Sequence, residues 1–281
     1  MRSIQCRTIS GTVASLFEQA CIHLPADVTS SLRRARRSEK SPLGLYAMDT
    51  ILNNVKAAKE DNVPICQDTG TAVVFLELGQ DVHVVGGDLN ECINEGVRNG
   101  YRTGYLRQSI VSQPFSQREN TCDNTPAVIH LEMVPGDRLK IFALAKGGGA
   151  ENCSRLTVLS PSAGYGGIID YVAGIISECG ANACPPLIIG IGIGGTAEKT
   201  MLLAKRSLLR KTGVPNPDPE TAGLEKDILA EVNKLGIGPM GYGGRVTALA
   251  VHIETFPCHM ASLPVAVNIQ CWCSRHNEAT I

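Results

Sequence analysis

The sequence predicts an α/β (mixed α+β) fold, with N-terminal helices followed by mixed β-sheets and flanking helices. Residues 10–62 place apolar side chains at helical spacing, and short apolar runs bounded by glycine and proline follow from residue 72 onward. Strand and helix patterns then mix irregularly, without a clean strand–helix–strand alternation, an internal repeat or a low-complexity linker. We therefore expect residues 1–281 to form a single domain.

The N-terminal segment, about residues 10–62, is predicted to contain three helices. Apolar residues between Ala14 and Cys21 form one helical face, and Pro25 ends this first helix. A second helix is expected from about Asp27 to Arg37, and Ser41-Pro42 opens a third. These helices lead into the first predicted strand of the sheet region.

Strands and further helices are predicted for the rest of the chain. Asp88 stands where an N-cap is expected, and Pro135-Gly136-Asp137 predicts a hairpin between the strands on either side of it. The predicted strands are Ala72–Leu78, Val82–Val85, Ala127–Met133, Arg138–Ala145, Pro186–Ile193, Ala248–Ile253 and Pro264–Ile269. The predicted helices are Leu89–Tyr105, Gly167–Cys179, Ala197–Arg210 and Glu220–Leu235.

Composition argues against nucleic-acid and membrane partners. The formal net charge is −1 and aromatic residues make up 4% of the chain, which disfavours a phosphate-binding or base-stacking surface. No apolar run reaches transmembrane length, and the N-terminal residues lack the apolar segment of a secretory signal. Eleven cysteines without such a signal indicate a reducing, cytoplasmic location, where thiols are free, catalytic or metal-bound.

The stretch from Pro64 to Thr71 concentrates chemically active groups in one predicted turn before a strand. It sets the thiol of Cys66, the amide of Gln67 and the carboxylate of Asp68 side by side. Gly70 permits a backbone angle that other residues resist. A plain turn with a buried cysteine is the alternative interpretation, because these residue types are ordinary in turns.

Three glycine-rich turns follow predicted strands and suit the approach of backbone amides to an anion. They are Lys146–Gly149, Gly190–Gly195 and Gly241–Gly244. The second matches the dinucleotide pattern G-x-G-x-x-G, but the acidic residue expected at the end of a second strand is missing. A carboxylate ligand therefore fits better than a phosphate.

The cysteine spacing favours widely separated metal ligands. No C-x₂-C pair occurs, which makes a zinc finger or ribbon improbable, and the Cys271-x-Cys273 pair alone is a weak indication. Iron–sulfur clusters can use distant thiolates, and Cys184 precedes proline as cluster ligands often do. Cys21, Cys92 and Cys179 lie in helical patterns and are expected to be buried core thiols.

Five short motifs occur in order over roughly residues 45–280: Pro64–Gly70, Lys146–Asn152, Ala183–Pro186, Gly194–Glu198 and Asn268–Trp272. Together they resemble the iron–sulfur-dependent class I fumarases and L-tartrate dehydratases. The resemblance is to the N-terminal domain of these enzymes, or to the alpha subunit where the enzyme is divided into two chains. It implies one fumarase-type alpha-subunit catalytic domain over residues 1–281.

The resemblance implies a [4Fe-4S] cluster held by three cysteines, with the fourth iron open to substrate. The motif-matched cysteines are Cys66, Cys184 and Cys271. Asp68 and His259 match active-site residues of the family and are expected to be catalytic. Gln67, Arg107, Lys146 and Gly149 match positions expected to bind the substrate.

Plainer roles stay open for two of these residues, since Arg107 could be a surface arginine and His259 a satisfied core histidine.

The dehydration chemistry of the family explains why these residue types are needed. Iron acts as a Lewis acid on a 2-hydroxy acid, while a base removes a carbon-bound proton and an acid protonates the leaving hydroxide. Arginine and glycine amides hold the dianionic substrate by charge-assisted hydrogen bonds.

The expected function is that of a hydro-lyase, the alpha subunit of a two-subunit fumarate hydratase of the tricarboxylic acid cycle. It would interconvert (S)-malate with fumarate and water. Only ten residues follow Cys271, so the family's C-terminal domain is expected on a separate beta subunit, in an assembly of two alpha and two beta chains. An L(+)-tartrate dehydratase alpha subunit is the first alternative, and a non-catalytic scaffold of the same fold is the second.

Overall fold

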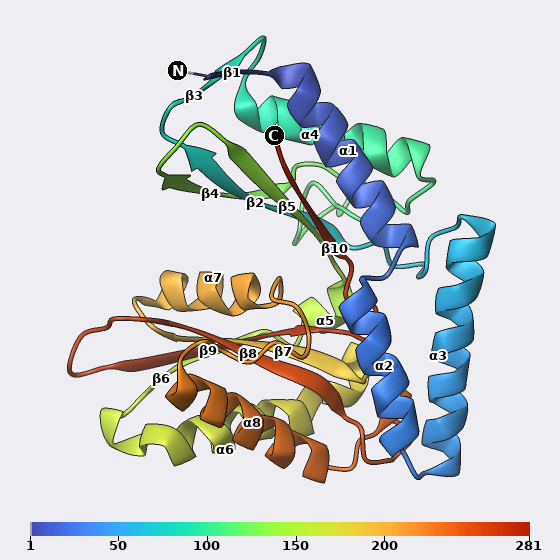
Figure 1. The fold of residues 1–281 in the computed structure, drawn as a ribbon, viewed down its shortest axis with the longest axis vertical. Helices are drawn as coiled ribbons and strands as arrows, with labels where there is room; N and C mark the ends of the chain where they lie inside the picture. Colours follow the sequence, from blue (N-terminus) through green and yellow to red (C-terminus); the bar gives the residue numbers. More distant parts are fainter. Residues whose placement is uncertain (1) are drawn as a thin grey trace. The chain divides into compact units, whose positions relative to one another are not determined.

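The computed structural model describes residues 2–281, which fall into two compact units. Unit 1 comprises the described residues up to Pro25, Val55–Gly148 and Arg275–Ile281, and unit 2 comprises Ala26–Asn54 and Gly149–Ser274. Each unit combines a four-stranded mixed sheet with helices (Figure 1). The predicted α/β fold is confirmed.

The sheet of unit 1 has the strand order β10-β5-β2-β4. Its central strand β2 (Thr71–Gly79) pairs parallel to β4 (Val128–Val134) and antiparallel to β5 (Leu139–Lys146), and β10 (His276–Thr280) pairs antiparallel to β5. The hairpin predicted at Pro135-Gly136-Asp137 is therefore wrong. The largely buried β2 takes the centre, whereas β4, with more exposed side chains, takes an edge.

Two helices complete the core of unit 1. Helix α1 (Cys6–Ile22) packs closely against α4 (Leu89–Thr103), where a Cβ at Gly96 would lie 2.6 Å from the Ser10 carbonyl oxygen. The carboxylate of Asp88 accepts hydrogen bonds from the N–H groups of Asn90 and Glu91, which confirms the predicted N-cap. Strands β1 (Arg2–Gln5) and β3 (Val82–Val85) form a small parallel sheet.

A disulfide joins Cys6, at the start of α1, to Cys92 in α4. The expectation that the thiols of this chain are unpaired is therefore wrong for these two residues. The other nine cysteines of the described chain form no disulfide, and among them Cys21 and Cys179 are buried as predicted.

Unit 2 is built on a sheet with the order β6-β9-β7-β8. Strand β7 pairs parallel to β8 and antiparallel to β9, and β9 pairs antiparallel to the edge strand β6. Helices α6 and α8 lie on one face of this sheet and α7 lies on the other (Figure 1). The bounds are β6 Arg155–Leu159, α6 Gly164–Cys179, β7 Leu187–Gly194, α7 Ala197–Ser207, α8 Pro219–Lys234, β8 Ala248–Phe256 and β9 Leu263–Gln270.

The N-terminal helical segment contributes two further helices, α2 (Ala26–Ser38) and α3 (Pro42–Asp61), close to the predicted bounds. Short helical turns are α5 (Gly148–Glu151), η1 (Pro161–Ala163), η2 (Gly180–Ala183) and η3 (Pro239–Gly241). Within residues 2–281, none of these helices is long and apolar enough to cross a lipid bilayer.

The glycines of the G-x-G-x-x-G pattern serve packing. Gly190 and Gly192 lie inside β7, where a Cβ would come within 2.2 Å of the Ala204 carbonyl oxygen and 2.0 Å of the Thr200 carbonyl oxygen. Both carbonyls belong to α7. Glycine at these positions lets the helix backbone approach the strand directly, because any side chain would collide with it.

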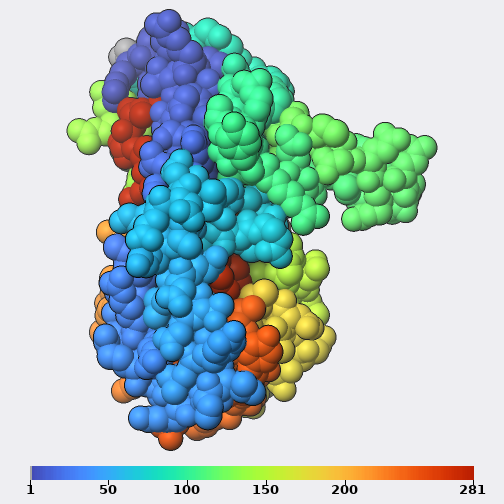
Figure 2. All heavy atoms as spheres, turned by 90° about the vertical axis from the view of Figure 1, so that its right-hand side faces the viewer, coloured from blue at the N-terminus to red at the C-terminus, as the bar shows by residue number. Residues whose placement is uncertain are grey.

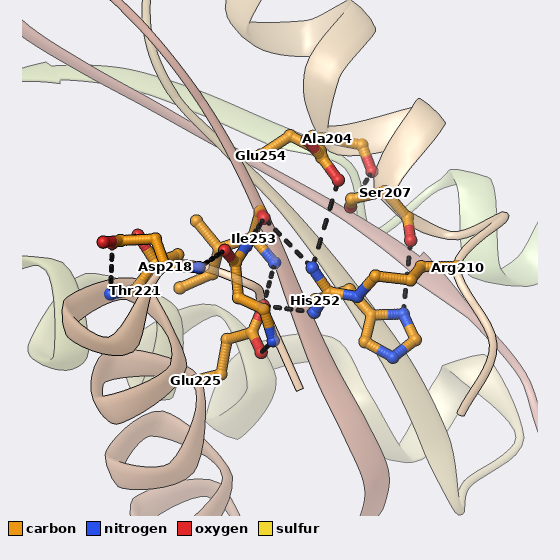
Figure 3. Close-up of polar contacts among 10 residues, drawn as sticks. Ala204, Ser207, Arg210, Asp218, Thr221, Glu225, His252, Ile253 and Glu254 are labelled. Carbon is orange, nitrogen blue, oxygen red and sulfur yellow. Dashed lines mark hydrogen bonds and ion pairs between the residues drawn. The ribbon is translucent and has the colours of Figure 1, made fainter. Parts of the chain in front are cut away.

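A buried ion pair ties the segment after α7 to α8 and β8 (Figure 3). Helix α7 ends at Ser207, three residues before its predicted end, and Arg210 pairs with Glu225. The Glu225 carboxylate also accepts the Ile253 N–H at 2.8 Å. The buried ring of His252 places its Nδ1 3.2 Å from the Ser207 carbonyl oxygen.

The third glycine-rich turn surrounds a structural carboxylate. Buried Glu39 accepts hydrogen bonds from the N–H groups of Lys40, Ser41, Arg245 and Val246 at 2.7 to 3.0 Å. A Cβ at Gly244 would lie 2.6 Å from Glu39 Oε2. Burial alone would raise the pKa of the Glu39 carboxyl, but these four N–H donors outweigh it and lower the pKa.

Candidate functional site

The turn before β2 is held from beneath by hydrogen bonds to its backbone. The Ile65 N–H donates to the Cys21 carbonyl at 2.9 Å, and the buried Tyr101 hydroxyl donates to the carbonyls of Thr69 and Gly70 at 2.8 and 3.1 Å. The Thr69 hydroxyl donates to the Arg107 carbonyl at 2.8 Å. These bonds fix the predicted turn as a rigid platform at the start of β2.

Asp68 has both carboxylate oxygens fixed by backbone donors. Its Oδ1 accepts the Gly70 N–H and its Oδ2 accepts the Gly148 N–H, each at 2.9 Å. The first donor lies in the turn itself and the second lies just after β5, so two of the five motifs meet inside unit 1. Asp68 is partly exposed, which leaves an oriented carboxylate within reach of solvent.

Glycine is required where the turn and β5 approach each other. Gly70 has a φ of 78°, and a Cβ there would lie 2.7 to 2.8 Å from backbone atoms of Lys146. A Cβ at Gly147 would lie 3.3 Å from both Asp68 Oδ2 and Arg275 Nη2. The two motifs therefore contain glycine because backbone and charged groups occupy the space of a side chain.

Arg275 is a site residue that sequence reasoning missed. Its side chain is 1% exposed, its Nη1 donates to the Asp68 carbonyl oxygen, and its own carbonyl accepts the Ala145 N–H at 3.0 Å. An arginine in a polar tail is expected to be solvated, so the local sequence carries no indication of this burial.

The thiols around the turn differ in access. Cys66 is partly exposed, with its Sγ 3.6 Å from Oε1 of the exposed Gln67. Cys21 lies buried behind the turn, and burial raises the pKa of its thiol to about 11, an effect that the charge of Arg275 partly offsets. Cys66 is thus the thiol of this turn that a metal could reach, while Cys21 stays protonated.

Two predicted substrate-binding residues of unit 1 differ in exposure. Arg107 is exposed at the start of the loop 107–126, which Figure 2 shows in green, standing out from the surface of unit 1. Asn124, near the end of that loop, donates to the Gly70 carbonyl at 3.2 Å and so anchors the loop to the turn. Lys146 is buried at the end of β5, opposite Thr71 of β2.

Unit 2 brings Cys184 and Cys271 together through strand register. Cys184 precedes β7 and Cys271 follows β9, and in this antiparallel pair Ile188 stands opposite Gln270. The N–H of Trp272 donates to the Cys184 carbonyl at 3.2 Å. Cys184 is exposed with a φ of 54°, Cys271 is partly exposed, and neither forms a disulfide.

Gly149 lies close to the Cys184 segment of unit 2. The position of its Cβ would be 3.4 Å from the Asn182 carbonyl oxygen, two residues before Cys184. Cys273 is buried, and its carbonyl oxygen lies 3.6 Å from Cys271 Sγ. Of the two thiols in the Cys271-x-Cys273 pair, only Cys271 is therefore accessible.

His259 lies at the other end of the unit 2 sheet. It is exposed in the segment between β8 and β9, where its Nδ1 accepts the Ala261 N–H at 3.1 Å. With Thr196, Glu198 and Lys199 it lines an open groove of about 670 Å³. The eight residues of β9 separate this end from Cys271 by about 26 Å at about 3.3 Å per residue.

Comparison with known proteins assigns the chain to a family. The model of the fumarate hydratase (Fumerase) family matches residues 10–280. The chain belongs to this family. It is 42% identical over 272 residues to the "Putative L(+)-tartrate dehydratase subunit alpha" of Methanocaldococcus jannaschii, covering 95% of each chain. It is 32% identical over 271 residues to the L(+)-tartrate dehydratase subunit alpha of Escherichia coli strain K12, covering 96% of this chain and 89% of the relative.

The donor set of this fumarate hydratase family member suits an iron–sulfur cluster. Cys66, Cys184 and Cys271 form no disulfide and have access to solvent, and thiolates are the ligands that iron–sulfur clusters use. Within each unit taken by itself, the described residues contain no group of three metal-binding side chains. A cluster held by these three cysteines therefore remains a prediction.

Substitution of Gly70 tests the close contact between the turn and β5. Gly70→Ala should lower the free energy of unfolding by more than about 3 kcal/mol, because the methyl group collides with the Lys146 backbone and φ is unfavourable. Chemical denaturation of the two proteins measures this difference.

Gly136→Ala is the matched control, because Gly136 also has a positive φ, 105°, but has no atom within 4 Å of its Cβ position. Its free energy of unfolding should fall by only about 1–2 kcal/mol, the cost of the unfavourable backbone conformation for alanine. Equal losses for the two variants would show that the contact between Gly70 and Lys146 does not constrain the turn.

Proposed function

We propose that this chain is the alpha subunit of a two-chain hydro-lyase that removes water from a 2-hydroxy dicarboxylate. The observation that carries the proposal is the Asp68 carboxylate, oriented by the Gly70 and Gly148 N–H groups next to the accessible thiol of Cys66. Membership in the fumarate hydratase family supports a hydro-lyase. The names of the relatives support an alpha subunit.

We propose Cys66, Cys184 and Cys271 as the ligands of one [4Fe-4S] cluster. The hydrogen bond from the Trp272 N–H to the Cys184 carbonyl joins the backbone segments of the last two, and each of the three thiols is accessible, which supports the proposal. When bound, a cluster with one iron free of protein ligands supplies a Lewis acid for substrate oxygens. The protein must then supply acid–base groups and donors for the carboxylates.

The residues around the turn fit these tasks. Asp68 is positioned to hold or transfer a proton, since its two oxygens already have fixed partners and a defined orientation. The exposed guanidinium of Arg107 and the exposed backbone of Gly149 suit a substrate carboxylate, and Gln67 adds an exposed amide. Lys146 is buried, so its ammonium group would act on the substrate through its charge and not by direct contact.

Two substrates compete within this reaction class. The Lys146–Asn152 and Gly194–Thr196 motifs resemble the fumarase branch, which favours (S)-malate and fumarate. The relatives compared above carry the name of L(+)-tartrate dehydratase alpha subunits, which favours L(+)-tartrate. Comparison of kcat/KM for the three compounds decides between them.

Cysteine substitutions test the proposed ligands. After anaerobic reconstitution with iron and sulfide, Cys66→Ser, Cys184→Ser and Cys271→Ser should each lose the broad visible absorbance of a thiolate-bound cluster. Cys258→Ser, which removes an exposed free thiol of unit 2, should keep it. Loss in Cys273→Ser together with retention in Cys271→Ser would move the third ligand to Cys273.

The division into subunits makes a second prediction. The resemblance to the family implies that the proton-abstracting group lies on the beta subunit. The alpha chain alone should therefore bind a cluster yet turn over malate or tartrate negligibly, because a positioned base contributes about 10²–10⁴-fold and water competes with the electrostatic contacts of an open site. Addition of the beta subunit should restore turnover. In the complex, Asp68→Asn should keep the cluster absorbance and lose most activity, because it removes the proposed proton-transfer carboxylate without removing a cluster ligand.

Full activity of a homogeneous alpha chain without a partner would contradict the split-site proposal. A reconstituted wild-type chain that holds neither iron nor sulfide would instead support the scaffold alternative. The two failures are distinct, since the first is seen in turnover and the second in metal analysis.

The distance along β9 constrains the role of His259. His259 lies beyond the far end of β9, a strand about 26 Å long, so it cannot act on a substrate bound at Cys271 of the same chain. We therefore propose that His259 acts in the site of a second alpha chain, which the proposed assembly of two alpha and two beta subunits contains.

Complementation between variants tests this arrangement. His259→Asn and Asp68→Asn should each be nearly inactive. Assemblies that contain one alpha chain of each variant should recover activity in up to about half of their sites, because one of the two sites then has an intact Asp68 from one chain and an intact His259 from the other. Absence of recovery after verified subunit exchange would contradict action between chains.

A further inference from the structure

We propose that Arg275 is a positioning residue that holds the Asp68 turn against the end of β5. The catalytic consequence of this role rests on the function proposed above for Asp68. The positioning itself rests on contacts within unit 1 and can be tested without turnover.

Arg275 contacts both segments that orient the Asp68 carboxylate. Its Nη1 donates to the Asp68 carbonyl oxygen, which holds the turn, and its own carbonyl accepts the Ala145 N–H at 3.0 Å, which holds it to β5. The donors to the carboxylate come from these same two segments, Gly70 from the turn and Gly148 after β5. Arg275 therefore connects the turn to the end of β5, and the spacing between these two segments fixes the orientation of the Asp68 carboxylate.

The burial of this arginine indicates a specific role. Arg275 is 1% exposed, which places it among the largest fully buried side chains of the described residues. Taking a guanidinium out of water costs several kcal/mol unless hydrogen bonds and opposite charge compensate. Here the guanidinium lies against the turn that carries Cys66, Gln67 and Asp68, where the Asp68 carbonyl oxygen accepts a hydrogen bond from its Nη1.

The shape of the site suits arginine better than lysine. A Cβ at Gly147 would lie 3.3 Å from both Arg275 Nη2 and Asp68 Oδ2, so the absence of a side chain there lets the guanidinium and the carboxylate approach the same point. The planar guanidinium can donate in two directions at once, toward the turn carbonyl and toward the carboxylate side. An ammonium on a flexible stem offers a point charge without this fork.

Amide hydrogen exchange in the full chain tests the positioning. In Arg275→Gln, the Gly70 and Gly148 amides should exchange about tenfold faster or more than in the wild type, because their hydrogen bonds to Asp68 lose a fixed acceptor. Interior amides of β2, from Val73 to Leu76, should keep wild-type protection. Arg275→Lys should show a smaller rise, since it retains the positive charge and can still donate an N–H to the turn carbonyl.

Arg210→Gln is the matched control, because it removes a mostly buried arginine from the ion-pair network of unit 2. It should leave exchange at Gly70 and Gly148 unchanged. Wild-type exchange at both amides in Arg275→Gln would overturn the proposal. A uniform rise along β2 and β5 would also overturn it, because that pattern indicates a general loss of stability.

The complex with the beta subunit provides the second measurement. Arg275→Gln should lower kcat by about 10²-fold, as a small misplacement of a catalytic group does, while Arg210→Gln should not. Selective exchange at Gly70 and Gly148 together with wild-type kcat would overturn the link to catalysis. If the wild-type complex itself lacks hydro-lyase activity, the proposed function fails, and the exchange measurement still decides the role of Arg275.

Discussion

The pair of hydrogen bonds that the Asp68 carboxylate accepts from Gly70 and Gly148 is the constraint on which the site of unit 1 depends. Both donors are backbone groups, so the turn and the end of β5 must lie at a fixed spacing. That spacing leaves no room for a side chain at Gly70 and little at Gly147, which explains the glycine two residues after Asp68 and the one directly after Lys146. Tyr101, Asn124 and the parallel and antiparallel partners of β2 hold the same platform from other sides.

Unit 2 uses strand register for a similar purpose. Antiparallel pairing of β7 with β9 places the residues before one strand next to those after the other, and this brings Cys184 beside Cys271 although 86 residues lie between them. The same pairing sends His259 to the opposite end of the sheet. Antiparallel pairing thus brings the two predicted ligands Cys184 and Cys271 together and places His259 at the opposite end of the sheet.

Local features of the sequence predicted much of this structure, and long-range features did not. Helical periodicity and the Asp88 cap are local, and the structure has them where expected. The order of β2, β4 and β5 depends on which strand is buried on both faces, and the turn residues at 135–137 cannot report it. Strand β10 is short and polar and exists because it pairs with β5, so its own residues predict no strand.

The site shows the same division. The turn chemistry of Cys66 and Asp68 was evident from residue types, whereas buried Arg275 looked like one more charged residue of a polar tail. The Cys6–Cys92 disulfide likewise depends on the packing of α1 against α4, which no spacing rule gives.

Anomalous X-ray scattering at the iron absorption edge, on crystals of the anaerobically reconstituted complex, tests the central claim most directly. The account predicts one iron cluster bonded to the sulfurs of Cys66, Cys184 and Cys271, with the Asp68 carboxylate facing it. Iron bound to other residues, or three cysteines that do not converge on a common iron site in the loaded protein, would contradict it.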